Sequence, residues 1–194
     1  MHAENNRHQL IEVKEAAANY DWSKCDELTE KLASSLSVED ALNVGVHEIE
    51  FCLAAFERRH SDIRWPRTLV SLIQQRDTAA YSLDFLPWTE GTNPIDSSLL
   101  NALEMLRNAA EDHDKPEACT WEVWRAVCWS IFARRLEYYA GEFPEDWEVS
   151  LLSASGKTNL PPIKSRYLAE PKIEEFTATL WLGFVREIES QLKV

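Results

Sequence analysis

Apolar residues recur along the chain at steps of three and four, which is the spacing of one face of an α-helix. The clearest stripe comprises Leu42, Val46, Ile49, Leu53 and Phe56. It follows Ser37, whose hydroxyl can cap a helix start. Similar patterns predict helices over about residues 5–19, 22–36, 66–83, 96–110, 120–140, 145–152 and 171–192. No run alternates apolar and polar residues over a length that would support a β-strand. The pattern predicts an all-α fold, a compact bundle of about seven helices with no sheet.

Breaker and capping residues predict where several helices begin and end. Asp21 and Asp96 are expected to cap helix starts, Pro66 to open a first turn, and Gly141 to close the helix over residues 120–140. That helix is apolar on nearly all sides, which predicts a central position. The short connection at Asp21 predicts an αα-hairpin. Tetratricopeptide-like stacking of such hairpins is an alternative arrangement, although no repeat recurs.

Size and composition fit one globular domain over residues 1–194. Hydrophobic residues make up 45% of the chain and charged residues 27%, and there are only five glycines. The N-terminal segment is polar and has no apolar core of a signal peptide. The four cysteines form no C-x-x-C pair. Charged residues interrupt the densest apolar stretch, over residues 121–139. These features predict a cytoplasmic protein without a membrane span.

Several short motifs resemble catalytic or binding signatures but lack an essential part. Ser155-Gly156-Lys157-Thr158 resembles the end of a phosphate-binding loop, yet Leu151 stands where the first glycine is needed and prolines follow in place of a helix. His47-Glu48 lacks the second histidine of a zinc protease and is expected to lie on a surface helix face. We therefore predict no catalytic residue, no cofactor and no metal ligand.

One alternative is a metal-dependent phosphohydrolase of the HD type. Such enzymes use a histidine, a His-Asp doublet and a later aspartate, and His60, His113-Asp114 and Asp146 occur here in that order. Imidazole and carboxylate groups together can hold a divalent cation and lower the pKa of its bound water. Under this alternative, metal is expected at His60, His113 and Asp114.

Negative charge dominates the chain and is unevenly distributed. The formal net charge is −13, and residues 84–122 contain nine acidic and two basic side chains. This charge disfavours nucleic acid and anionic membranes as partners but permits a basic protein. Two acidic segments are the predicted partner surface: Glu111, Asp112, Asp114 and Glu117 in the first, and Glu142, Glu145, Asp146, Trp147 and Glu148 in the second.

The sequence thus favours a protein-binding domain over an enzyme. One concrete form is an immunity protein or antitoxin that occludes the cleft of a basic, nuclease-like toxin, since complementary charge accelerates such encounters. The alternatives are the HD-type phosphohydrolase and a helical-hairpin scaffold. Trp65, Trp88 and Trp147 lie at predicted element boundaries, where a tryptophan can anchor a partner. The sequence does not indicate an oligomeric state.

Overall fold

The computed structural model describes residues 2–82, 93–147 and 170–192. These residues form α-helices and one short 3₁₀ helix, with no strand among them. The elements are α1 (His2–Ala18), α2 (Trp22–Ala33), α3 (Val38–Arg59), α4 (Trp65–Gln74), η1 (Thr78–Ser82), α5 (Pro94–Glu111), α6 (Pro116–Glu142) and α9 (Pro171–Leu192). The predicted all-α bundle is confirmed.

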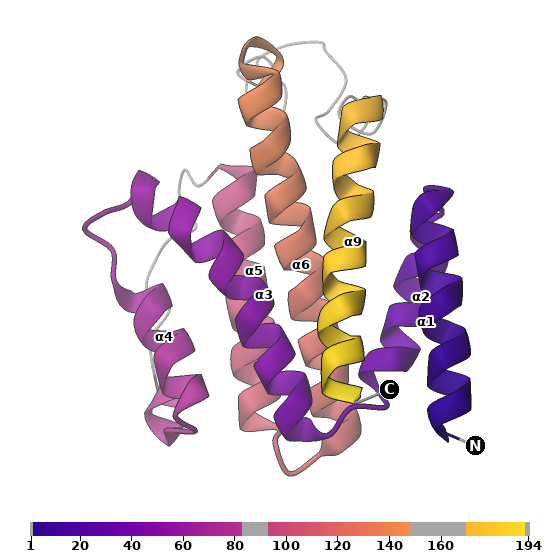
Figure 1. Cartoon of the computed structure of the whole chain (residues 1–194). Helices are drawn as coiled ribbons and strands as arrows, with labels where there is room; N and C mark the ends of the chain where they lie inside the picture. Colours follow the sequence, from indigo (N-terminus) through magenta and orange to yellow (C-terminus); the bar gives the residue numbers. More distant parts are fainter. Residues whose placement is uncertain (1, 83–92, 148–169, 193–194) are drawn as a thin grey trace.

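α6 lies at the centre of the bundle, as its apolar character predicts. It packs against α5 and α3 along much of its length and also contacts α9 and α2 (Figure 1). Gly45 of α3 permits a close approach of three helices. A Cβ atom at this position would lie 2.8 Å from Leu106 of α5 and 3.2 Å from Val123 of α6. The five residues of the α3 stripe are all buried.

The first two helices form the predicted αα-hairpin at one edge of the bundle (Figure 1). Two polar contacts connect the hairpin to α9. Lys14 Nζ lies 2.9 Å from Glu189, and the indole nitrogen of Trp22 donates a hydrogen bond of 2.6 Å to Glu174. The ring of Trp22 is half-buried rather than fully in the core. None of the described helices has the length and apolar character that a membrane span requires.

Side-chain caps explain several helix starts. Asp21 accepts a hydrogen bond from the backbone of Lys24, and Ser37 accepts one from that of Asp40, as predicted. The prediction for α5 is wrong by three residues. Asn93 is its N-cap and accepts from the backbone of Asp96, so that Asp96 lies in the first turn.

Other boundaries also differ from the predictions. α4 ends at Gln74 and the chain continues through η1, so that Ala80 is buried without belonging to a long helix. α6 begins at Pro116 and ends at Glu142, which places Gly141 inside the helix. Residues 144–147 are helical. Residues 148–152 of the predicted short helix, the segment with Gly156 and Lys157, and Leu83 and Trp88 lie outside the described residues.

Candidate functional site

The first predicted acidic segment forms the turn between α5 and α6. Glu111 ends α5, Asp112 follows it, and Glu117 lies in the first turn of α6; the side chains of Glu111, Asp114 and Glu117 are exposed. Lys115 pairs with Asp112 at 2.6 Å, and this hydrogen bond raises the pKa of the lysine, as do the charges of Asp112, Asp114 and Glu111. The turn and the two helix ends beside it therefore contain four acidic side chains and one lysine.

Trp121 is an exposed aromatic side chain beside these acids. It lies one helical turn after Glu117, and 45% of its surface is exposed although α6 packs against several other helices. The guanidinium of Arg125 lies 5.6 Å from the centre of its ring, within cation–π distance. The sequence analysis missed this residue, because an apolar helix conceals one exposed position. The sequence did contain a signal of this exposure, because Glu117 stands four residues before Trp121 and Glu122 directly after it.

The electrostatics of Glu122 show how acidic this region is. Partial burial raises the pKa of its carboxyl first, and the nearby charges of Asp112 and Glu104 raise it further, against the opposing effect of Arg125. Burial is the largest of these causes, and the effects of Asp112 and Glu104 show that further acids lie near this carboxyl. We name the region formed by Glu104, Glu111, Asp112, Asp114, Glu117, Trp121 and Glu122 the acidic corner.

The second predicted segment lies at the other end of α6. Glu142 pairs with Lys172 at 3.0 Å, and Trp147 packs with its edge against Tyr139 in a small core cluster. Glu145 is exposed and Asp146 is half-buried, whereas Glu148 lies outside the described residues. At 1.5 Å per residue, the two ends of α6 are about 40 Å apart. The predicted partner residues therefore form two separate surfaces.

The residues of the HD-type alternative are not brought together. His60 is at the end of α3 beside the start of α5, whereas His113 and Asp114 follow the end of α5, about 27 Å away along that helix. Asp146 lies beyond α6. The described residues contain no group of three or more histidine, cysteine, aspartate or glutamate side chains placed to hold a metal.

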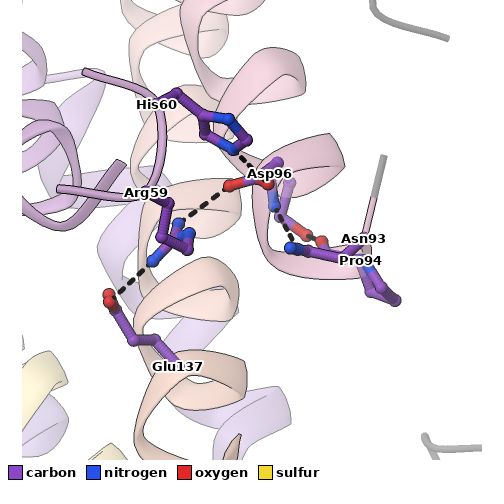
Figure 2. A network of polar contacts seen from close by, with 7 residues as sticks. Arg59, His60, Asn93, Pro94, Asp96 and Glu137 are labelled. Atoms are coloured by element: carbon purple, nitrogen blue, oxygen red, sulfur yellow. Dashed lines mark hydrogen bonds and ion pairs between the residues drawn. The ribbon is translucent and has the colours of Figure 1, made fainter. Parts of the chain in front are cut away.

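His60 instead belongs to a structural network around Asp96 (Figure 2). The carboxylate of Asp96 is 2% exposed and lies 2.8 Å from Arg59 and 2.9 Å from His60. Arg59 also pairs with Glu137 of α6 at 2.9 Å. The network joins α3, α5 and α6 at one end of the bundle.

A second buried acid corrects the prediction for the His47-Glu48 segment. Glu48 does not lie on a surface face: it is 2% exposed and 3.3 Å from Arg134 of α6. Burial raises the pKa of its carboxyl, while the charge of Arg134 lowers it. His47 is exposed. The signal in the sequence was the position of Glu48 two residues after Val46 and one before Ile49, next to the buried stripe.

Comparison of the chain with models of protein families, with curated proteins and with solved structures finds no match.

Proposed function

We propose that this protein is a helical protein-binding domain that docks a basic partner on the acidic corner. The observation that carries the proposal is Trp121, an exposed indole in the second turn of the central helix, one helical turn after Glu117 and next to Glu122 in the chain. Tryptophan is enriched among the residues that contribute most to protein interfaces, where a large ring is desolvated by the partner. The acids around it would attract basic side chains before contact.

The two faces of the Trp121 ring suit this role. Arg125 lies near one face, 5.6 Å from the ring centre. An arginine or lysine of the partner can approach the exposed part of the ring, where the cation–π attraction adds to the charges of Asp114 and Glu117. The concrete form that we propose is inhibition of a basic, nuclease-like toxin, whose cationic cleft would be covered by this corner.

Capture of partners from the source cell tests the proposal. The wild-type protein is immobilised, and captured proteins are identified at low and at high salt. We expect a strongly basic protein whose capture weakens as salt rises, because screening reduces charge attraction. Trp121→Ala and the double variant Asp114→Lys/Glu117→Lys should lose this protein.

Glu145→Lys is the matched control, because it changes an exposed acid at the other end of α6. It should retain the captured protein. The proposal is contradicted if only neutral or acidic proteins are captured, or if Glu145→Lys loses the basic protein while the corner variants keep it. For the toxin form, co-expression with the captured protein should restore growth only when the corner is intact.

A further inference from the structure

A groove on another face of the molecule is unlike the acidic corner in both shape and charge. α3 and α9 run in opposite directions in front of α6 and diverge toward one end (Figure 1). Between them lie two adjoining hollows of about 520 and 470 Å³, which share Phe51, Arg134 and Phe176 as lining residues. We name this the α3–α9 groove.

The lining of the groove is mixed, with aromatic and small residues beside charged side chains, and it is partly open. The ring of Phe51 is 49% exposed, the rings of Tyr138 and Phe176 stack at 4.1 Å, and Leu180 is buried. Gly141 and Gly183 both border the groove, and a Cβ atom at either position would meet no atom within 4 Å. An aromatic ring that remains half-exposed beside open space is typical of a surface that another molecule covers.

The length of the groove suits a short helix. Its walls extend from His47 to Arg58 on α3 and from Phe176 to Glu187 on α9. Eleven residue steps at 1.5 Å correspond to about 16 Å, or about three turns of a helix. A helix placed there can direct residues at i, i+3, i+4 and i+7 into the hollows, which is the usual way in which an amphipathic helix binds a groove.

The charges of the groove identify the kind of helix. Three of the four acids that line it pair with a basic side chain: Glu48–Arg134 at 3.3 Å, Glu137–Arg59 at 2.9 Å and Glu142–Lys172 at 3.0 Å. The fourth, Glu187, accepts a hydrogen bond from Gln191 and lies 3.8 Å from His47, a contact that is an ion pair only when the histidine is protonated. By contrast, no carboxylate of the described residues lies within ion-pair distance of Arg58 or Arg186. These two arginines border opposite ends of the groove. Although the lining contains one more glutamate than arginine, the guanidinium groups of Arg58 and Arg186 remain available to carboxylates of a bound molecule.

From this shape and charge we infer that the α3–α9 groove binds an amphipathic helix of another protein, with an apolar face and acidic residues near both of its ends. The apolar face would cover Phe51 and Phe176, and the acidic ends would meet Arg58 and Arg186. The groove is separate from the acidic corner, so that the two surfaces can bind different partners at the same time. The inference does not depend on the proposed function.

A synthetic peptide tests the groove directly. The probe is a labelled helical peptide of about 14 residues, about four turns, with leucine and phenylalanine on one face and glutamate at both ends. A second peptide has the same apolar face but lysine at both ends. Binding to the full chain is measured by fluorescence anisotropy. We expect micromolar affinity for the glutamate peptide and at least tenfold weaker binding of the lysine peptide.

Variants locate the binding. Gly183→Leu and Gly141→Leu fill the groove at two places, and each should weaken binding of the glutamate peptide at least tenfold. Ser190→Leu, at an exposed position of α9 outside the groove, should leave the affinity for this peptide unchanged. Arg58→Glu/Arg186→Glu should reverse the preference between the peptides, whereas Arg64→Glu should not. Trp121→Ala should leave peptide binding unaltered, which separates this test from that of the acidic corner.

Four outcomes would overturn the inference. They are no binding of the glutamate peptide at hundreds of micromolar, equal binding of both peptides, unchanged binding by both folded leucine variants, and self-association of the chain that Gly183→Leu abolishes. The last result would assign the groove to a second copy. Thermal unfolding followed by circular dichroism establishes that each variant is folded, and leucine in place of a helical glycine should raise the melting temperature.

Discussion

At the scale of single residues, two buried carboxylates form ion pairs between helices of the bundle. The carboxylate of Asp96 pairs with Arg59 of α3 and with His60, which follows that helix. The carboxylate of Glu48 in α3 pairs with Arg134 of α6. Buried charges are costly unless they are paired, and removal of one partner leaves the other unsatisfied. We therefore expect Asp96 to stabilise the fold, whereas burial disfavours the charged form of Glu48.

Asp96→Ala should lower the free energy of unfolding by about 2–3 kcal/mol, because the partly buried guanidinium of Arg59 and the ring of His60 lose their shared acceptor. Urea unfolding followed by circular dichroism measures the change. Glu189→Ala, which removes a half-exposed partner of Lys14, should cost less than about 1 kcal/mol. Equal effects of the two substitutions would mean that the Asp96 network contributes no more than a surface pair.

Glu48 should make the stability depend on pH in a particular direction. Burial raises its pKa in the folded protein above the ordinary value of 4.5. The folded state therefore takes up this proton at a higher pH than the unfolded state. The contribution of this group to stability is complete below 4.5 and is lost as the pH rises through the folded-state pKa.

Glu48→Gln, which stays neutral, should consequently be more stable than the wild type at pH 7. The difference should shrink as the pH approaches 4.5, because the wild-type carboxyl is then protonated as well. Urea unfolding of both proteins at several pH values isolates the effect of residue 48 on stability, since all the other carboxyl groups titrate in the wild type and in the variant alike. A wild type that is the more stable protein at pH 7 would show that the ion pair with Arg134 outweighs burial.

At the scale of helices, the glycines distinguish close packing from open space. Gly183→Ala should raise the free energy of unfolding by up to about 1 kcal/mol, because alanine is the better helix former and nothing lies near the new Cβ atom. Gly45→Ala should lower it by about 1 kcal/mol or more, because its Cβ atom would lie 2.8 Å from Leu106. Chemical unfolding measures both, and a stabilising Gly45→Ala would indicate that α3 can move away from α5 and α6.

Most helices could be predicted from the chain, and the physical reason is local. The stripe from Leu42 to Phe56 and the cap at Ser37 depend on neighbours a few residues away, which a sequence displays directly. The α5 start was mispredicted because Asn93 and Asp96 are both good capping residues. Pro94 directly after Asn93 was the local signal for the correct start, and the contact with Arg59 and His60, from outside the helix, is consistent with a place for Asp96 inside the first turn.

The candidate site was only partly predictable, for the same reason. Glu111, Asp112, Asp114 and Glu117 were expected to be a surface segment, and the structure places the first three around one turn and Glu117 in the turn of helix that follows. The separation of this segment from Glu142–Glu148 depends on the length of α6, which was predicted too short at both ends. The exposure of Trp121 depends on which neighbours surround α6, and no local pattern contains that information.

At the scale of the whole molecule, the four thiols should be unreactive while the chain is folded. Burial raises the pKa of Cys25 and of Cys52 to about 12 and that of Cys119 to about 11, and it also raises the pKa of Cys128 well above its usual range. Thiolate is the reactive form. With a disulfide reagent at pH 8, we expect slow reaction of the native protein and four thiols after denaturation. Rapid reaction of one thiol in the native state would contradict this expectation.

The surface of the molecule has two faces of different character. The acidic corner has six acidic side chains and one exposed tryptophan, whereas the α3–α9 groove has aromatic and charged residues and is bordered by Arg58 and Arg186. Both faces include residues of α6, but the acidic corner lies around its first turns and the groove around its second half, so that each can be changed independently. This arrangement suits a protein that binds other proteins.

The affinity of the purified basic partner, measured by calorimetry at two salt concentrations, tests the central claim most directly. The wild type should bind more weakly at the higher salt, and Trp121→Ala should reduce the affinity at least about tenfold, as expected for the central residue of an interface. An affinity that is independent of salt and unchanged by Trp121→Ala would contradict a functional role for the acidic corner.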